Sequence, residues 1–190
     1  MLTYTIDKGK EFGYWNDDVS KYLYHDSLIE IKYFLKKNNI NINCSIGDFG
    51  GGNGILKNYF QNLTTIDSDV NKNPDILDNI LTHKNYYDLV ILRYVLHYLN
   101  DYEVIKLFKN INAKNILIIQ FINKDLRSKY LNSKNELKYF RNEQHLMQLI
   151  PIKNKKIYSK EYLVTKEYYI NRIGIGKYIK HKEILNAYYI

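Results

Sequence analysis

The chain has 190 residues and an apolar content of 45%, which is enough for one domain with a full hydrophobic core. Its single cysteine, Cys44, excludes an internal disulfide, and the chain shows neither a signal-peptide core nor a membrane span, so a cytoplasmic protein is expected. The net charge of +8 is compatible with a nucleic-acid partner, but scattered lysines and an abundance of Lys, Asn, Ile and Tyr are typical of an AT-rich genome, so charge alone excludes little.

The first 39 residues are expected to form an N-terminal helical segment. One helix face is marked by apolar residues at helical spacing: Tyr24, Leu28, Ile31 and Leu35. Lys36 and Lys37 suit a helix C-terminus, and Asn38-Asn39 is expected to end the helix. An aromatic group that includes Tyr14 and Trp15 comes before it, without clear periodicity.

A glycine-rich stretch follows this helix. Residues 40–46 alternate apolar and polar side chains, which predicts a short strand, and apolar residues after position 54 recur at helical spacing. The stretch therefore predicts a strand, a glycine loop and a helix. In doubly wound folds this junction holds adenosine-bearing cofactors, because glycines let the ligand approach the backbone and the helix N-terminus offers free N–H groups.

The spacing of the glycines excludes two common cofactor-binding motifs. Ile55 stands where a G-x-G-x-x-G pattern from Gly50 requires glycine, and no glycine is followed by the Lys-Ser/Thr of a P-loop. The pattern present is Asp48-x-Gly50-x-Gly52-x-Gly54. It resembles motif I, D/E-x-G-x-G-x-G, of the class I S-adenosylmethionine-dependent methyltransferases. The resemblance implies S-adenosylmethionine as cofactor, S-adenosylhomocysteine as product, and as binding residues Asp48, Gly50, Gly51, Gly52 and Gly54. The alternative is a tight glycine turn that binds no ligand.

A second strand is predicted at Leu63–Ile66, which is rich in β-branched residues, after a short crossover helix. It ends in Asp67, whose carboxylate would face the ligand crevice and accept hydrogen bonds from both ribose hydroxyls. Asp67 is therefore the expected ribose ligand. Asp69 is the alternative if the strand runs longer.

A short third strand is predicted at Asp75–Leu77, since Pro74 blocks a long helix there. Asp78 comes at its end. Methyltransferases of the resembled class commonly place an acid at this point, where it accepts a hydrogen bond from the adenine amino group. The resemblance implies this role for Asp78, and a capping or solvated role is the alternative.

The stretch from Tyr87 to Leu99 carries the second part of the resemblance, because it is similar to the family's fourth strand and the turn after it. Leu89–Leu92 is fully apolar, as in a central parallel strand. Arg93 and Tyr94 come just past its end, where ligands bind in open α/β sheets. Arg93 is expected to contribute to the cofactor site, or to hold an anionic substrate group or part of a lid, with a solvated charge as the alternative. Tyr94 is an expected substrate contact.

Candidate bases are few. His97, on the turn after the fourth strand, is the candidate catalytic base because histidine takes a proton near neutral pH; packing beside the pocket is its alternative role. His25 and Tyr14 are weaker candidates, and Cys44 is expected to be buried in the first strand and to be a poor nucleophile. In the resembled family, a helix before the first strand covers the cofactor pocket. Tyr14 and Trp15 would then either line a lid over the substrate or pack an N-terminal arm onto the domain.

The remaining elements follow in the family's order. Asp101 is a plausible cap for a helix carrying Val104, Ile105 and Phe108. The later elements are expected as a fifth strand at Asn115–Ile122, a helix over 134–149 capped by Ser133, and a closing strand pair at Tyr162–Asn171 and Ile184–Tyr189.

The pattern and the resemblance together imply a doubly wound, Rossmann-like α/β fold. Its sheet is expected to have seven strands, mostly parallel with one antiparallel, and helices on both faces. The chain is expected to be one methyltransferase domain over 1–190. Its parts would be an N-terminal lid or helical segment (1–39), a cofactor-binding half (40–125), and a substrate-side helix with the closing strand pair (126–190).

The resemblance implies methyl transfer to an O or N nucleophile, with a small molecule or natural product as the expected substrate. The N/D-P-P-Y/F/W motif of amino-methylating DNA and glutamine enzymes is absent after the fourth strand, and there is neither a cysteine pair for C5-pyrimidine methylation nor a zinc-ligand cluster. RNA methylation is the alternative, favoured by the charge and by many tyrosines that can stack bases. A non-catalytic methyltransferase-like partner subunit is a further alternative. No membrane partner is expected, and the sequence leaves the oligomeric state open.

Overall fold

The computed structural model describes residues 4–5, 28, 31–52, 54–122, 128–131, 137–141, 143–150, 156–163 and 182–188. Two sheets organise these residues, a main sheet of seven strands and a small one of three. The strands of the main sheet are β2 (Ile46–Phe49), β3 (Leu63–Asp67), β4 (Ile76–Leu77), β5 (Tyr87–Arg93), β6 (Ala113–Ile122), β9 (Lys156–Leu163) and β10 (Lys182–Tyr188). Those of the small sheet are β1 (Tyr4–Thr5), β7 (Ser128–Leu131) and β8 (Leu137–Phe140).

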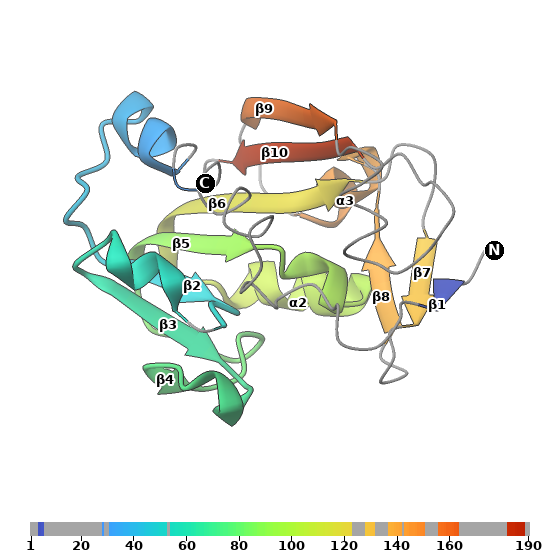
Figure 1. Cartoon of the computed structure of the whole chain (residues 1–190), viewed down its shortest axis with the longest axis horizontal. Coiled ribbons are helices and arrows are strands. Elements are labelled where there is room, and N and C mark those ends of the chain that lie inside the picture. Colours follow the sequence, from blue (N-terminus) through green and yellow to red (C-terminus); the bar gives the residue numbers. More distant parts are fainter. Residues whose placement is uncertain are drawn as a thin grey trace.

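The main sheet has the strand order β4-β3-β2-β5-β6-β10-β9. Neighbours from β4 to β6 pair in parallel, and β10 runs antiparallel to both β6 and β9. The predicted α/β class with a parallel sheet is therefore confirmed. The chain leaves β2 for β3 and β4 on one side and returns to β5 on the other (Figure 1). The carboxyl ends of β2 and β5 thus flank the point where the strand order reverses, which is where ligands bind in such folds.

Helical elements cover both faces of this sheet. They are a helix at 31–37, η1 (Ile55–Asn58), η2 (Val70–Lys72), η3 (Leu96–Tyr98), α2 (Asp101–Asn110) and α3 (Glu143–Leu149). On one face, the helix at 31–37 packs in a cluster with Leu89 and Ile91 of β5. On the other face, α2 and α3 pack in a cluster with Val90 and Leu92. Successive residues of β5 therefore face opposite layers, and the strand is buried on both sides.

The helix at 31–37 ends where the asparagines predicted it. Asn39 has a left-handed backbone with φ 53°, and Ile40 donates its N–H to the carbonyl of Leu35 at 2.9 Å. This is the hydrogen bond of a Schellman cap, in which asparagine is a common substitute for glycine. Leu28, Ile31 and Leu35 are buried in the core, so the predicted apolar face is confirmed over these residues. Tyr24 lies outside the described residues.

The predicted start of the first strand is wrong. Residues 40–45 form turns, and β2 begins only at Ile46. Asn41 accounts for this difference, because its side-chain oxygen accepts the N–H of Asn43 at 2.9 Å and its carbonyl accepts the N–H of Cys44 at 3.0 Å. Such a local side-chain hydrogen bond competes with strand pairing. Cys44 is consequently half-buried in a turn and does not lie in the strand.

Two predicted helices have different boundaries. Asn100, and not Asp101, is the N-cap of α2, since Asn100 Oδ1 accepts the N–H of Glu103 and Glu103 Oε2 accepts the N–H of Asn100 in a capping box. The helix predicted over 134–149 is wrong in its first half, where strand β8 occupies Leu137–Phe140 and α3 begins only at Glu143. Ser133, its predicted cap, lies outside the described residues.

The C-terminal strands lie earlier than predicted. β9 begins at Lys156 instead of Tyr162, and β10 begins at Lys182 instead of Ile184. The remainder of the first predicted strand, 164–171, and Tyr189 of the second lie outside the described residues. The sequence around both strands is rich in tyrosine and isoleucine, so composition alone does not show where each strand begins or ends.

The small sheet was not predicted. β1 pairs in parallel with β7, Tyr4 opposite Tyr130, and β8 pairs antiparallel with β7. Figure 1 shows this sheet beyond the arrowheads of β5 and β6, and β8 packs against η3. Tyr14, Trp15 and His25 lie outside the described residues, so their predicted roles stay predictions. Within the described part of the chain, no helix has the length and apolar character needed to cross a membrane.

Candidate functional site

The glycine loop after β2 places three of its glycines in a left-handed backbone conformation. Gly50, Gly52 and Gly54 have positive φ angles of 68°, 55° and 66°. Gly50 donates its N–H to the carbonyl of Ile66 at 2.7 Å, which ties the start of the loop to β3. A Cβ at Gly50 would lie 2.7 Å from a methyl carbon of Val95, so the turn after β5 leaves room for glycine alone.

Gly52 faces open space. A Cβ built at this residue would meet no heavy atom of the described residues within 4 Å, in contrast to Gly50, Gly51 and Gly54. The backbone at the tip of the loop is therefore accessible to a ligand, and the short helix η1 follows directly at Ile55. This is the arrangement in which a glycine loop lets a cofactor approach the main chain.

Asp48 lies under the loop and is buried, with 1% of its surface exposed. Neither of its carboxylate oxygens has a hydrogen-bond partner among the described residues. Burial raises the pKa of Asp48 to about 6; the positive charge of Arg93 opposes this shift and the negative charge of Asp67 adds to it. A buried carboxylate without partners is costly, so it is a candidate ligand for a group that brings hydrogen-bond donors.

Gly51 explains why the carboxylate and the loop can lie so close. A Cβ at this residue would lie 2.7 Å from Oδ2 of Asp48 and 2.9 Å from its carbonyl oxygen. Any larger residue would displace the Asp48 side chain, because contacts below 3 Å are not sustained by real Cβ atoms.

Asp67, at the end of β3, is joined to the loop. Its Oδ2 accepts the N–H of Gly52 at 3.1 Å, and its Oδ1 accepts the N–H of Asp69 at 3.0 Å. Asp69 has a capping role instead: its Oδ1 accepts the N–H of Asn71 at 3.0 Å, which makes Asp69 the N-cap of η2. Of the two predicted candidates, Asp67 is thus the one that contacts the glycine loop.

Asp78 follows the edge strand β4 and lies beside Asp67. Its N–H donates to the carbonyl of Asp67 at 3.1 Å. Its Oδ2 lies 2.8 Å from Nδ1 of His83, and its Oδ1 accepts the N–H of Asn79 at 2.7 Å. The hydrogen bond to His83, followed by that from Asn79, lowers the pKa of Asp78. Asp48, Asp67 and Asp78 therefore lie at the carboxyl ends of three neighbouring strands.

Arg93 and Tyr94 close the site on the other side. Arg93 is the last residue of β5 and is buried, and its charge acts on Asp48. Tyr94 has a left-handed backbone with φ 56°, which is uncommon for a residue other than glycine and occurs at functional turns. Its ring packs in the same core cluster as the helix at 31–37, and only 6% of the residue is exposed. A substrate contact by Tyr94 stays a prediction.

His97, the predicted base, is fully buried on η3. Its ring lies 4.2 Å from that of Tyr98, centroid to centroid. Proton transfer to a substrate requires contact with it, so this burial favours the packing role over the catalytic one. The catalytic role stays a prediction.

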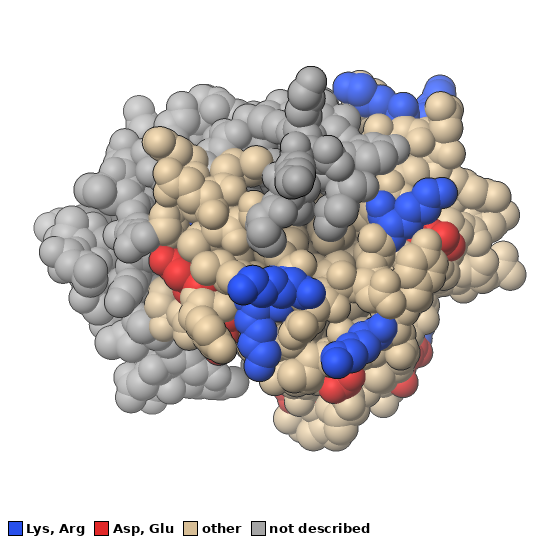
Figure 2. All heavy atoms as spheres, turned by 180° about the vertical axis from the view of Figure 1, so that it is seen from behind, with Lys and Arg blue, Asp and Glu red and all other residues tan. Residues whose placement is uncertain are grey.

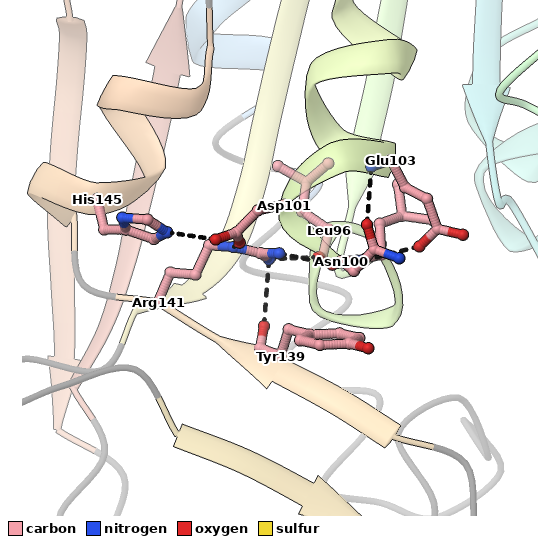
Figure 3. Close-up of polar contacts among 8 residues, drawn as sticks. Leu96, Asn100, Asp101, Glu103, Tyr139, Arg141 and His145 are labelled. Atoms are coloured by element: carbon pink, nitrogen blue, oxygen red, sulfur yellow. Dashed lines mark hydrogen bonds and ion pairs between the residues drawn. The ribbon is translucent and has the colours of Figure 1, made fainter.

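Arg141 was missed by the sequence analysis, although it holds the η3 turn in place. Its Nη1 donates to the carbonyl of Leu96 at 2.9 Å, its Nη2 to that of Leu99 at 2.6 Å, and its Nε to Asp101 at 2.8 Å. Figure 3 shows this guanidinium between β8, η3 and α2, with His145 of α3 on the second oxygen of Asp101 at 3.0 Å. Burial of Asp101 opposes ionisation, but the hydrogen bonds from Arg141 and His145 lower its pKa. No sequence signal links these residues, which lie far apart in the chain.

On the face shown in Figure 2, the basic side chains of the described residues form no continuous patch. Figure 2 shows the described Lys and Arg side chains of one face in separate groups, several of them beside Asp or Glu. Lys57, for example, pairs with Asp75 at 2.5 Å. Among the described residues, no group of three or more His, Cys, Asp or Glu is placed to hold a metal ion.

Comparison with known proteins identifies the fold. No family model and no curated protein matches the sequence. Among solved structures, magnesium protoporphyrin IX methyltransferase from Synechocystis PCC 6803, with bound S-adenosylmethionine, matches with a TM-score of 0.61 and 12% identity, over 95% of this chain and 86% of that one. The 1,6-didemethyltoxoflavin N1-methyltransferase of Burkholderia thailandensis, with bound S-adenosylhomocysteine, matches with a TM-score of 0.55 and 13% identity, over 77% and 71%.

A third match shows how far the similarity extends. Coclaurine N-methyltransferase, also with bound S-adenosylhomocysteine, matches with a TM-score of 0.53 and 13% identity. The match covers 72% of this chain but only 51% of that enzyme, so about half of the larger protein has no counterpart here. At these identities the comparison establishes the fold, which is that of the class I S-adenosylmethionine-dependent methyltransferases.

Proposed function

We propose that this chain, which has the class I methyltransferase fold, binds S-adenosylmethionine and transfers its methyl group to an O or N nucleophile of a small molecule. The observation that carries the proposal is Asp48. It is a buried carboxylate without a partner among the described residues, under a glycine loop whose tip at Gly52 faces open space. The three enzymes compared above contain bound S-adenosylmethionine or S-adenosylhomocysteine in their solved structures.

The amino-acid end of the cofactor would lie at Asp48. Its ammonium group carries a positive charge and several hydrogen-bond donors, which complement an ionised carboxylate in a low-dielectric site. Gly51 and Gly52 keep the main chain close enough for contact on either side. Arg93, beside Asp48, would complement the cofactor carboxylate at the same end.

The adenosine end would extend along the neighbouring strands. Asp67 would accept hydrogen bonds from the ribose hydroxyls. Its oxygens already accept the N–H groups of Gly52 and Asp69, but each carboxylate oxygen has a second lone pair for a ligand. Asp78, one strand further out, would accept from the adenine amino group.

When bound, S-adenosylmethionine supplies a methyl group on a sulfonium, which is already an activated leaving group. The chain therefore has to hold the two reactants in line and to exclude water. The turn after β5, with the left-handed Tyr94 and the η3 segment clamped by Arg141, would form the acceptor side. A rigid turn at that place favours a fixed approach of the nucleophile.

A small-molecule acceptor is supported by the enzymes that share the fold. Their names give 1,6-didemethyltoxoflavin, coclaurine and magnesium protoporphyrin IX as substrates. RNA methylation has the net charge in its favour, but the described basic side chains of the face in Figure 2 form separate groups and no continuous patch. RNA affinity would have to fall steeply with salt, so a flat salt dependence removes that alternative.

Thermal unfolding tests the cofactor part of the proposal. Saturating S-adenosylhomocysteine should raise the melting temperature, since a ligand at a hundred times its Kd stabilises the native state by about 2.7 kcal/mol. NAD, which shares the adenosine moiety, should leave it unchanged. A shift with NAD alone, or with neither compound, contradicts the proposal.

A further inference from the structure

We propose that His83 is a positioning residue for nucleobase selection: its hydrogen bond to Oδ2 of Asp78 fixes the carboxylate that distinguishes adenine from hypoxanthine. The inference rests on the proposed cofactor site and deepens it. It concerns a residue that contributes no atom to the expected ligand contacts.

His83 forms the middle of a hydrogen-bonded chain that leads from the core to the surface. Its ring is buried, with 3% of the side chain exposed, whereas the Asp78 side chain is 41% exposed. Nδ1 lies 2.8 Å from Oδ2 of Asp78, and Nε2 lies 3.1 Å from the hydroxyl of Tyr87. These two hydrogen bonds therefore connect a buried tyrosine to a carboxylate at the ligand-binding edge of the sheet.

The chemistry of the three groups determines which of them donates in each hydrogen bond. Asp78 has a lowered pKa, so it is ionised near neutral pH and can only accept. Nδ1 of His83 must then carry a hydrogen. In the neutral ring, Nε2 then accepts a hydrogen bond from the Tyr87 hydroxyl. Burial raises the pKa of Tyr87, although a hydrogen bond with Asn85 opposes this shift, so the hydroxyl keeps its proton.

Aromatic packing holds the histidine ring in place. Phe49 of β2 meets it edge-on at 5.4 Å and 88°, and Tyr87 of β5 stacks on it at 5.9 Å and 23°. Since both neighbours lie on central strands, the imidazole has little freedom to turn. Asp78 is thereby held by a rigid donor on Oδ2 and by the N–H of Asn79 on Oδ1.

A carboxylate held in this way can select a base. The exocyclic amino group of adenine donates to it, whereas hypoxanthine presents a carbonyl oxygen at the same position, and two acceptors repel each other. A carboxylate free to turn would escape this repulsion and could reach the N–H of the hypoxanthine ring. Selectivity then depends on the donor that prevents the turn, which is His83.

The test compares S-adenosylhomocysteine with S-inosylhomocysteine by calorimetric titration of the full-length protein. The two compounds differ in the group at position 6 of the base and in the hydrogen on N1 that accompanies the carbonyl oxygen. His83→Phe keeps a ring for Phe49 and Tyr87 but removes the hydrogen bond. It should reduce the preference for the adenine compound by about tenfold. A purely structural role would weaken both ligands equally and leave the ratio unchanged, and that result overturns the inference.

Two further variants protect the test against misfolding. The double variant His83→Phe, Tyr87→Phe removes both ends of the buried hydrogen bond, which is nearly neutral for stability, and should show the same loss of preference. Tyr86→Phe makes the same chemical change at the exposed neighbouring tyrosine and should retain the wild-type ratio.

The outcomes separate this inference from the proposed function. If the wild type binds neither compound, the cofactor site itself is wrong and the inference falls with it. If the wild type binds both equally, the contact between Asp78 and adenine is wrong. If the wild type prefers adenine and the double variant keeps that preference, the cofactor site stands and the role of His83 is refuted.

Discussion

Gly52 donates its backbone N–H to Oδ2 of Asp67 at 3.1 Å. This bond joins the tip of the glycine loop after β2 to the end of β3, so that the residue expected to bind ribose also fixes the loop expected to contact the rest of the cofactor. The site is thus preorganised by a contact between two parts of the chain that the sequence motif treats separately.

Asp67→Ala should weaken S-adenosylhomocysteine binding by about 2 to 4 kcal/mol, because it removes the charge-assisted hydrogen bonds to the ribose and also releases Gly52. Calorimetric titration measures the loss. Asp69→Ala is the matched control, since the Asp69 side chain accepts the N–H of Asn71 as the N-cap of η2, and should leave the affinity nearly unchanged. Unchanged affinity in Asp67→Ala together with weakened binding in Asp69→Ala would mean that Asp69 is the ribose ligand.

Asp48→Asn should stabilise the ligand-free protein near neutral pH. The pKa of Asp48 is raised from an ordinary value of 3.8 to about 6, so its ionisation opposes folding. The penalty is absent below pH 3.8, where the carboxyl is protonated in both states, and fully present above about pH 6. We expect a gain of about 1 to 3 kcal/mol at neutral pH.

Urea unfolding of both proteins at about pH 4 and about pH 8 checks this prediction. The gain should be present at the higher pH and largely lost at the lower one. An asparagine variant that is less stable at the higher pH would mean that the carboxylate has stabilising contacts in the ligand-free state.

Gly52→Asn should fold but lose cofactor affinity. Asparagine tolerates the left-handed backbone at this residue better than other side chains, and its side chain would project into the open space that the cofactor needs. We expect a stability loss of at most about 1 kcal/mol, measured by urea unfolding, and at least tenfold weaker binding, roughly the effect of one lost contact. Gly52→Val is a poorer test, because a β-branched residue is strained at a φ of 55° whether or not a ligand binds. Normal cofactor binding by folded Gly52→Asn would contradict the glycine-loop assignment.

Arg141→Met should destabilise the fold by about 2 to 4 kcal/mol, since it leaves the carbonyls of Leu96 and Leu99 and the carboxylate of Asp101 without their buried donor. His145→Gln is the comparison, because His145 bonds the other oxygen of Asp101. Its loss should be smaller. Equal losses of unfolding free energy in the two variants would show that the contact with Asp101, and not the hydrogen bonds from Arg141 to the η3 carbonyls, determines the effect.

The parts of the fold that the sequence predicted are those encoded by neighbouring residues. Asp48 and the three alternate glycines determine the loop, because the chemistry of the turn is local, and the apolar run Leu89–Leu92 indicates a central strand by itself. The start of β2 could not be found in the same way, since a hydrophobic alternation over 40–46 and the turn at Asn41 compete, and the turn prevails.

The parts that the sequence did not predict depend on residues that meet only in the folded chain. Arg141 lies 42 residues from Leu99 and follows strand β8 of the small sheet. The strands β1 and β7 of that sheet come from before and after the parallel strands β2 to β6. His83 is close to Asp78 in sequence, but its significance arises from Phe49 and Tyr87, which lie on two other strands. No spacing rule connects such groups.

The proposed cofactor site is tested most directly by calorimetric titration of the wild type and of Asp48→Asn with S-adenosylhomocysteine at about pH 8, where Asp48 is ionised. We expect micromolar binding to the wild type, no binding of NAD, and affinity at least about tenfold weaker in the variant, because the ammonium group of the ligand loses its counter-charge. Equal affinity in both proteins, or no binding to a wild type shown to be free of carried-over ligand, would contradict it.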